Sequence, residues 1–242
     1  MVDSKMSNMW VFGYGSLIWN PGFEFLDSKV GYIKGYARRF WQGNDFHRGN
    51  PEKPGRVATL VEEEQGLTWG RAFLLGPGAE SSLTYLDSRE AKLGGYITTI
   101  VTFYPRDPKE EPFPSLLYVA LPSSRLYMGP APLPQVATEI AEATGHCGHN
   151  AEYLLRLADF MREHVPEAWD EHLYLLDHLV RARLKESNLS IEDVMGEGQS
   201  LAVAAIAAGN LDNRLEERRR SPSPTSDYAS RISSRKLRCL DL

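Results

Sequence analysis

The residues best suited to chemistry lie in a glycine-rich turn close to the beginning of the chain. A short apolar, β-favouring run, Trp10–Phe12, is interrupted by the turn and resumes at Leu17. Two glycines one residue apart, Gly13 and Gly15, permit positive φ angles and leave backbone amides with no Cβ in front of them. Such a turn at a strand end can direct successive N–H groups at an anionic or oxyanionic ligand. A strand with a glycine bulge is the alternative.

Three better-known glycine motifs do not fit this turn. The dinucleotide-binding fingerprint requires glycine at the position of Ile18. The phosphate-binding P-loop requires a lysine, and the segment has none. The nucleophile elbow requires a residue between its glycine and its serine, whereas Gly15 and Ser16 are adjacent. The turn therefore matches none of these three classes of site.

Glu90 is the residue best suited to proton transfer. The spacing of apolar residues between positions 78 and 93 predicts a helix, and a pair of glycines stops it. One face of this helix consists of Leu83, Leu86, Glu90 and Leu93. Burial of a carboxyl group on an apolar face raises its pKa, which makes a glutamate a useful base near neutral pH. The alternative is that Glu90 forms an ion pair with Arg89 or Lys92, or lies exposed at the edge of the face.

The clusters of histidine, cysteine and acidic residues do not have the spacing of a metal site. His146, Cys147 and His149 lack the second ligand pair that structural zinc requires, and the polar start of a helix explains them better. The segment Asp170–His172 has the wrong order for a helical zinc motif and fits a solvated helix face. We therefore predict no metal ligands. The loop residues His47–Arg48 either meet a carboxylate ligand or cap a turn.

Composition and charge exclude several classes of protein. The chain has 242 residues, of which 42% are hydrophobic, so it can form one domain with an appendage. Residues 1–213 carry 19 basic and 28 acidic side chains, whereas residues 214–242 carry eight basic and four acidic ones. An acidic body is a poor binder of nucleic acid. The short basic tail can contact an acidic partner.

The localisation expected from the sequence is the cytosol. Two cysteines are too few for a disulfide framework and indicate a reducing compartment. The first residues have no apolar stretch typical of a signal peptide. The longest apolar run, residues 201–208, is too short to span a bilayer, so we expect no membrane association.

The order of predicted elements is strands, one helix, strands, and then helices, which favours an α+β fold over alternating βαβ units. Strands are predicted at 10–12, 30–41, 55–61, 67–75, 96–104 and 115–121, and 55–61 and 67–75 are expected to form a hairpin around an acidic connection. Helices are predicted at 78–93, 134–143, 149–164 and 166–186. Glycines within the strands fit a small, strongly bent mixed sheet or barrel. We expect one domain at 9–186 and a tail at 187–242 that is partly helical and then disordered.

Four segments in order resemble the ChaC-type γ-glutamylcyclotransferases, in particular the glutathione-specific branch. They are Phe12–Trp19, Arg38–Gly43 with His47–Gly49, Tyr85–Tyr96 and Tyr127–Pro132. The resemblance covers about residues 9–185. One short form of the family has Arg-Glu-Lys-Gly-Gly-Tyr, whereas this chain has two more residues between its Arg-Glu pair and Gly-Gly-Tyr. The tail has no counterpart in the family.

The resemblance implies a compact γ-glutamylcyclotransferase-like (BtrG-like) mixed β-barrel with packed helices. It implies a carbon–nitrogen lyase that converts glutathione into 5-oxoproline and cysteinylglycine without a metal or organic cofactor, and we expect it to act as a monomer. The family's catalytic glutamate falls on Glu90. The resemblance implies that Tyr14–Leu17 holds the γ-glutamyl group, and the substrate-binding candidates are Phe12, Gly13, Tyr14, Gly15, Ser16, Leu17 and, as a weaker candidate, Tyr127. Arg38 and Arg39 are weaker candidates for substrate binding.

Two other functions are compatible with the sequence. The first is a cyclotransferase of the same fold that acts on other γ-glutamyl amines or γ-glutamyl amino acids. The second is a non-catalytic protein that binds γ-glutamyl groups or a partner through the turn or the basic tail. The presence of both Glu90 and the segment Tyr14–Leu17 argues against a non-catalytic protein.

Overall fold

A closed barrel of five strands, in the order β1-β3-β2-β4-β5, forms the centre of the described part of the chain. The computed structural model describes residues 9–76, 79–86 and 96–196. The strands are β1 (Trp10–Gly13), β2 (Phe25–Asn44), β3 (Gly55–Leu75), β4 (Tyr96–Pro105) and β5 (Phe113–Ala120). β1 pairs in parallel with β5, and the other pairs are antiparallel. The predicted mixed barrel of an α+β fold is therefore confirmed.

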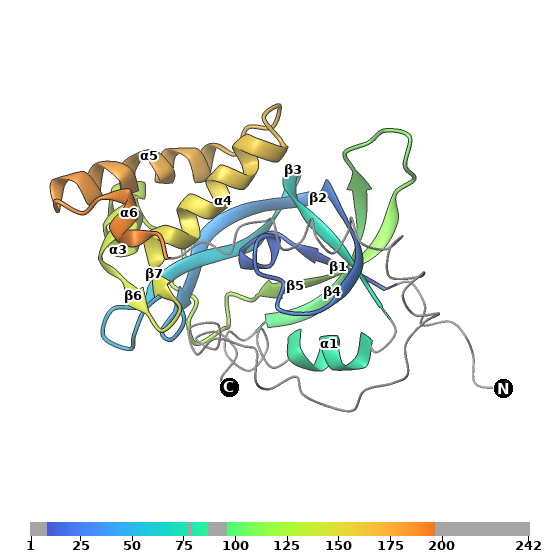
Figure 1. Ribbon diagram of the computed structural model, residues 1–242, viewed down its shortest axis with the longest axis horizontal. Helices are drawn as coiled ribbons and strands as arrows, with labels where there is room; N and C mark the ends of the chain where they lie inside the picture. The colour runs from blue at the N-terminus through green and yellow to red at the C-terminus, as the bar shows by residue number, and fades with distance from the viewer. Residues whose placement is uncertain (1–8, 77–78, 87–95, 197–242) are drawn as a thin grey trace, which may run out of the picture. The chain divides into compact units, whose positions relative to one another are not determined.

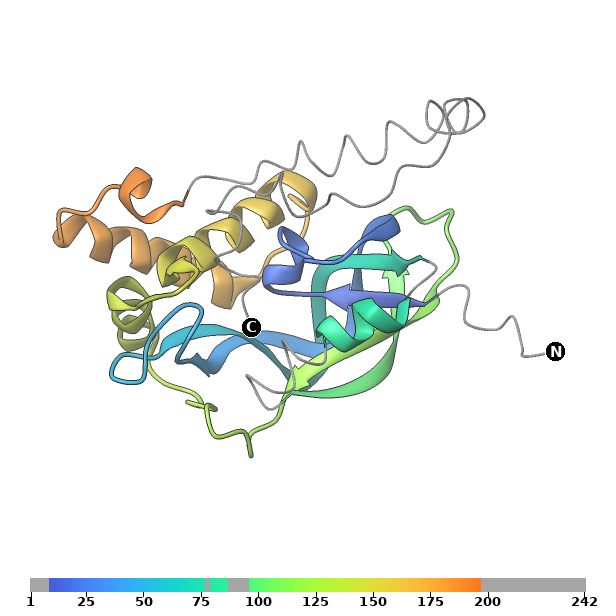
Figure 2. The same ribbon diagram turned by 60° about the horizontal axis from the view of Figure 1, so that its bottom comes forward.

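The described helices form two groups beside this barrel. Figures 1 and 2 both show α3, α4, α5 and α6 grouped beside one part of the barrel and α1 apart from them. The helices are α1 (Ala79–Leu86), α3 (Leu133–Glu142), α4 (Asn150–His164), α5 (Glu171–Glu186) and α6 (Ile191–Val194), and a 3-10 turn, η1 (Ser16–Ile18), follows β1. The short strands β6 (Thr144–Gly145) and β7 (Gly148–His149) pair with each other before α4. Of the predicted tail at 187–242, residues 187–196 are described and include α6, and residues 197–242 lie outside the described residues, as does the second half of the predicted helix at 78–93.

Two clusters of buried apolar side chains connect these elements. The larger cluster joins the barrel strands to α3, α4 and α5; among its members are Phe12, Ile18, Phe103, Val136, Leu154 and Leu176. The smaller cluster joins β1 and η1 to α1; it includes Val11, Leu17, Phe73 and Leu86. Successive side chains of a strand point to opposite faces, so Val11 and Phe12 belong to different clusters. The glycine turn lies where the two clusters adjoin, because Leu17 and Ile18 are divided in the same way.

The predicted hairpin at 55–75 is wrong, because β3 is one continuous strand of 21 residues. Both halves of β3 pair antiparallel to β2, with Tyr36 opposite Glu62 and Lys34 opposite Leu67. Four residues of β3, 63–66, therefore lie opposite the single residue Gly35. Gly35 has φ +82°, a conformation that residues with a side chain disfavour. Glycine at this position therefore allows β2 to accommodate the irregularity in the pairing. The acidic segment thus interrupts the pairing of β3 with β2, but the chain does not turn back there.

A second irregularity, a β-bulge, interrupts the β2–β3 ladder nearer the helices. Arg39 pairs with Thr59 and Gln42 pairs with Val57, so two residues of β2, 40 and 41, lie opposite one residue of β3, Ala58. This is the two-against-one arrangement of a β-bulge. Peptide groups at such a site lose their partners in the neighbouring strand and need others if they are buried.

Groups from elsewhere in the fold bond to the peptide groups at this bulge. The Phe40 N–H donates to His172 Nε2 at 3.1 Å, and the Phe40 carbonyl accepts from Arg56 Nη1 at 3.2 Å. The Ala58 N–H donates to the Tyr153 hydroxyl at 3.2 Å. Since Tyr153 lies on α4 and His172 on α5, the bulge bonds the barrel to both helices.

Helix α5 begins five residues later than predicted. Asp170 caps it, because the Leu173 N–H donates to Asp170 Oδ1 at 3.1 Å, and the other carboxylate oxygen accepts from Arg38 Nη1 at 2.9 Å. This double use of Asp170 fixes the first turn of α5 and so the position of His172. The starts of α3 and α4 differ by one residue from the predictions.

We predict that His172 makes the stability of the fold decline in mild acid. Burial, and next the nearby Arg39 guanidinium, lower the pKa of His172 from 6.5 to about 4. The unfolded chain then binds more protons between these two values, so the stabilisation is complete above pH 6.5 and is lost as the pH falls towards 4. The loss amounts to about 3 kcal/mol of unfolding free energy. Denaturant unfolding at pH 7, 5.5 and 4.5 measures it.

The variant His172→Gln separates this effect from other acid-sensitive groups. A glutamine Oε1 can accept the Phe40 N–H in place of Nε2 but does not titrate, so the variant should show a shallower decline. His178→Gln, at an exposed position of the same helix, is the matched control and should decline as the parent does. Equal declines in His172→Gln and the parent would show that the imidazole does not carry the pH dependence.

Candidate functional site

The glycine turn is shaped by close approach and not by positive φ angles. Gly15 precedes η1 with φ −133° and ψ −132°, and neither Gly13 nor Gly15 is among the described glycines with positive φ. A Cβ on Gly13 would lie 2.7 Å from Leu17 Cβ, and a Cβ on Gly15 would lie 2.3 Å from the Tyr153 hydroxyl oxygen. Both distances are too short for a side chain, so the turn needs glycine at both positions.

The backbone of the turn places its amides ahead of a short helical segment. The Ile18 N–H donates to the Gly15 carbonyl at 3.0 Å, and the Asn20 N–H donates to the Ser16 carbonyl at 2.8 Å. The N–H groups of Ser16 and Leu17 come before these bonded N–H groups in the chain. That backbone N–H groups of the turn meet an anionic or oxyanionic group stays a prediction.

The apolar side chains of the turn anchor it at both ends. Phe12 is 1% exposed and contacts Phe103, with ring centroids 5.6 Å apart, while Tyr14 lies 6.4 Å from the Phe12 ring. Leu17 is buried in the smaller cluster together with Leu86. The two anchors belong to different clusters, so the backbone between them is held from both sides.

Tyr153, which falls within the helix predicted at 149–164, lies against the glycine turn. It is 4% exposed, and its hydroxyl oxygen lies against Gly15 while accepting from the Ala58 N–H. Its ring meets Trp19 and Phe40 edge-on, with centroids 5.2 and 6.0 Å apart. Apolar spacing in a sequence can predict a helix but carries no information about the partner of a tyrosine hydroxyl.

Tyr127 lies on a strap, residues 126–129, that runs beside the bulge of β2. Residue Gln42 forms an isolated β-bridge with Tyr127, and the Gly43 N–H donates to the carbonyl of Leu126 at 2.7 Å. The N–H groups of residues 128 and 129 both donate to the Trp41 carbonyl, at 2.9 and 3.1 Å. The half-buried Tyr127 is thereby connected to the bulge, and through Ala58 and Tyr153 to the glycine turn.

Glu90 lies outside the described residues, so its surroundings remain a prediction. The first half of its predicted helical face is described. Leu86 is fully buried in the same cluster as Leu17, and Leu83 packs against that cluster. The helix that leads to Glu90 therefore packs beside the glycine turn.

The arginines considered for substrate binding are all paired with carboxylates. Arg38 bonds to Asp170, and Arg39 Nη2 lies 2.8 Å from a Glu63 carboxylate oxygen. Arg48 Nη1 lies 2.5 Å from Glu152 Oε2. The Arg38 pair fastens β2 to the start of α5, the Arg48 pair fastens the following loop to α4, and the Arg39 pair joins β2 to β3. The three pairs account for the guanidinium groups without a ligand.

His149, the residue directly before α4, caps its first turn. The Nδ1 atom of His149 accepts from the Ala151 N–H at 3.1 Å, which confirms the predicted polar helix start. Burial, and then the Arg48 charge, lower the pKa of His149. Among the residues that the structure describes, no group of three His, Cys, Asp or Glu side chains has a metal-binding arrangement. None of the helices in the same residues is long and apolar enough to cross a membrane.

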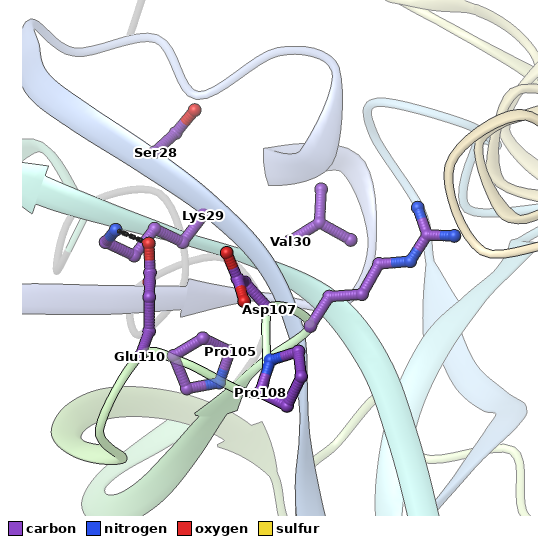
Figure 3. Close-up of a pocket in the computed structure, with 8 residues that line it drawn as sticks. Ser28, Lys29, Val30, Pro105, Asp107, Pro108 and Glu110 are labelled. Carbon is purple, nitrogen blue, oxygen red and sulfur yellow. Dashed lines mark hydrogen bonds and ion pairs between the residues drawn. The ribbon is translucent and has the colours of Figure 1, made fainter.

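An open pocket lies beside the turn between β4 and β5, and none of the predicted site residues lines it (Figure 3). Its lining residues are Ser28, Lys29, Val30, Pro105, Arg106, Asp107, Pro108 and Glu110. Lys29 Nζ lies 2.6 Å from Glu110 Oε1 across this pocket. The ammonium group is thus already neutralised, and we do not assign the pocket to the site.

Comparison with known proteins identifies relatives over most of the described chain. The family model described as ChaC-like protein matches residues 9–183. The chain is 53% identical to human glutathione-specific γ-glutamylcyclotransferase 1 over 172 residues, which cover 71% of this chain and 78% of the relative. It is 51% identical to the protein of the same name from zebrafish, Danio rerio, over 74% of this chain and 92% of the relative.

One solved structure supports the fold assignment. The crystal structure of a γ-glutamyl cyclotransferase specific to glutathione from yeast superposes with a TM-score of 0.66 at 26% sequence identity. The superposition covers 73% of this chain and 96% of the yeast chain.

We predict that a methyl group on Gly15 destabilises the fold through its clash with Tyr153. Gly15→Ala places its Cβ 2.3 Å from the hydroxyl oxygen, and overpacking of this kind costs about 1–3 kcal/mol. In the variant Tyr153→Phe the nearest ring atom, Cζ, lies 3.5 Å from the same Cβ, an ordinary contact. Gly15→Ala should therefore cost less unfolding free energy in the Tyr153→Phe protein than in the parent.

The double-mutant cycle supplies its own control. Tyr153→Phe alone leaves the Ala58 N–H without its acceptor, at a cost of about 1–3 kcal/mol. Denaturant unfolding of the four proteins gives the coupling between the two positions. Strictly additive costs would contradict the contact between Gly15 and the Tyr153 hydroxyl.

Proposed function

We propose that this chain, which belongs to the ChaC-like protein family, cleaves the γ-glutamyl bond of glutathione and releases 5-oxoproline and cysteinylglycine. The observation that carries the proposal is the identity of more than half of the aligned residues with two proteins named glutathione-specific γ-glutamylcyclotransferase 1. The barrel, the glycine turn and the strap with Tyr127 all fall within the part matched by the family model. The yeast structure of a glutathione-specific enzyme supports the same assignment.

The reaction is an intramolecular transfer that needs a folded substrate conformer. The α-amine of the γ-glutamyl group attacks its own γ-carbonyl, which forms the new C–N bond of the five-membered ring. The bond from that carbonyl to the cysteine nitrogen then breaks. Holding the two reacting ends in contact removes most of the entropic barrier of such a step.

We assign the proton transfers to Glu90. The attacking amine must lose a proton and the departing nitrogen must gain one, and one carboxyl group can do both in turn. A glutamate with an ordinary pKa of about 4.3 is a weak base for an α-ammonium group with a pKa near 8, and the difference costs roughly 5 kcal/mol in the proton transfer. Raising the pKa of the glutamate to about 6–7 recovers around 3 kcal/mol. The burial of Leu86 supports an apolar setting for this helix.

The glycine turn and Tyr127 are assigned to substrate binding. The segment Tyr14–Leu17 holds the γ-glutamyl group, and its backbone amides stabilise the oxyanion that forms on the γ-carbonyl, an effect worth a few kcal/mol. Gly13 and Gly15 are needed because the turn approaches Leu17 and Tyr153 too closely for other residues. The anchoring of Phe12 in the larger cluster supports a turn that is rigid before the substrate arrives.

The remaining proposals concern the localisation, the cofactors and the partners of the protein. We propose that it acts in the cytosol as a monomer, without a metal or organic cofactor, and without nucleic acid or membrane partners. The net charge of −5 and the two cysteines support this proposal.

A product assay with matched variants tests the proposed function. Purified protein treated with a chelator is incubated with glutathione and, in parallel, with γ-glutamyl-alanine, and 5-oxoproline is quantified. We expect product from glutathione and little from γ-glutamyl-alanine. Glu90→Gln should lower kcat by about 10²–10⁴ while it preserves shape, because a general acid–base contributes an effect of that size.

Glu64→Gln, at an exposed position of β3, is the matched control and should retain full activity. Product mainly from γ-glutamyl-alanine would move the protein to the branch of the fold that acts on other γ-glutamyl compounds. No product from either substrate would favour a non-catalytic binding protein. Full activity of Glu90→Gln would remove Glu90 from the mechanism.

A further inference from the structure

Arg56 is a fully buried arginine whose backbone is fixed at the start of α4. It is 2% exposed and is among the largest buried side chains of the described residues. Its N–H donates to Asn150 Oδ1 at 2.7 Å, and its carbonyl accepts from Asn150 Nδ2 at 2.9 Å. Asn150 is itself fully buried and is the first residue of α4. The Cα of Arg56 therefore has a defined position, from which its side chain reaches three other segments.

The guanidinium group of Arg56 connects α3, the bulge of β2 and the strap. Its Nε donates to a carboxylate oxygen of Glu139 on α3. Its Nη1 donates to the carbonyl of Phe40 at 3.2 Å and to the carbonyl of Gly129 at 2.8 Å. Burial of a charge is costly unless it is paired, and the ion pair with Glu139 offsets that cost here. The planar, multi-donor guanidinium can bond several acceptors at once, which a lysine ammonium at this place cannot reproduce in the same geometry.

Gly129 is the point at which this network reaches Tyr127. Its carbonyl is held by Arg56 and its N–H donates to the carbonyl of Trp41 at 3.1 Å, so both sides of the residue are fixed. Gly129 has φ +70°, which reverses the strap directly after Met128. The ring of Tyr127 lies next to Gly129, with Cε1 3.6 Å from the place a Cβ would occupy. The position of the ring thus depends on where the Gly129 peptide is held.

We propose that Arg56 is a positioning residue that sets the placement of Tyr127 in the substrate site. The inference rests on the proposed function, because it takes Tyr127 as a contact to glutathione. Arg56 makes no contact with the reacting atoms in this account. Its loss should weaken substrate binding through Tyr127 and leave the proton transfers of Glu90 unchanged.

The test is a cycle of Arg56→Lys and Tyr127→Ala, with kcat and KM for glutathione measured for all four proteins. Lysine keeps a positive charge for Glu139 but loses the hydrogen bonds that Nη1 donates to the carbonyls of Phe40 and Gly129. We expect Arg56→Lys to raise KM about tenfold with kcat within about twofold of the parent. In the Tyr127→Ala protein there is no ring to position, so Arg56→Lys should leave KM unchanged.

The matched control is Arg48→Lys. Arg48 also forms a buried ion pair, with Glu152, but bonds none of the residues of the strap. It should alter KM much less than Arg56→Lys does. If Arg56→Lys does not fold, Glu139→Gln loosens the hold on the same guanidinium and should raise KM in the parent and not in the Tyr127→Ala protein.

The outcomes separate this inference from the proposed function. An equal rise in KM in both backgrounds, or a loss of kcat with no change in KM, would overturn the positioning role of Arg56. An unchanged KM in Tyr127→Ala alone would overturn it by removing Tyr127 from substrate binding. Amide exchange gives a readout without activity: Arg56→Lys should speed exchange of the Gly129 N–H at least tenfold, and Arg48→Lys should not. An inactive parent with that exchange response would contradict the proposed function alone, and no exchange response would overturn the inference.

Discussion

The peptide groups released at the β2 bulge are the constraint on which the arrangement of this fold depends. A buried N–H or C=O without a partner costs about 1–3 kcal/mol, and the bulge at Phe40 creates several at one place. Side chains from three elements meet them: Arg56 from β3, Tyr153 from α4 and His172 from α5. Because each of these bonds has a narrow geometry, satisfying the bulge also fixes both helices against the barrel.

The same side chains that satisfy the bulge shape the two parts of the proposed site. The hydroxyl of Tyr153 bonds to Ala58 and also forms the surface against which Gly15 lies. Arg56 bonds to the bulge and also to the carbonyl of Gly129 beside Tyr127. β-Bulges are common next to active sites, where they redirect side chains. Here the bulge links the glycine turn to the strap through two bonded side chains, and their positions are set by the core and not by the ligand.

The elements were predictable from the sequence where local pattern determines them, and the connections between them were not. The spacing of apolar residues correctly predicted β4, β5, α3 and α4, and the resemblance correctly indicated the barrel. The acidic segment at 62–66 was mistaken for a hairpin turn, because its pairing is decided by Gly35 on another strand. The role of Arg56 was missed because a buried arginine cannot be distinguished in sequence from an exposed one. A bulge has no recognisable pattern in the local sequence, and its peptide groups bond to residues more than a hundred positions away, such as His172.

Native-state amide hydrogen exchange at Phe40 and Ala58 tests the central claim most directly. Each amide has a side-chain acceptor inside the core, His172 Nε2 for Phe40 and the Tyr153 hydroxyl for Ala58. We predict protection close to that of core ladder amides, and a marked loss of protection at Ala58 in Tyr153→Phe. Exchange of both amides in the parent at the rate of exposed loop amides would contradict the account, because the bulge would then not help to hold α4 and α5 to the barrel.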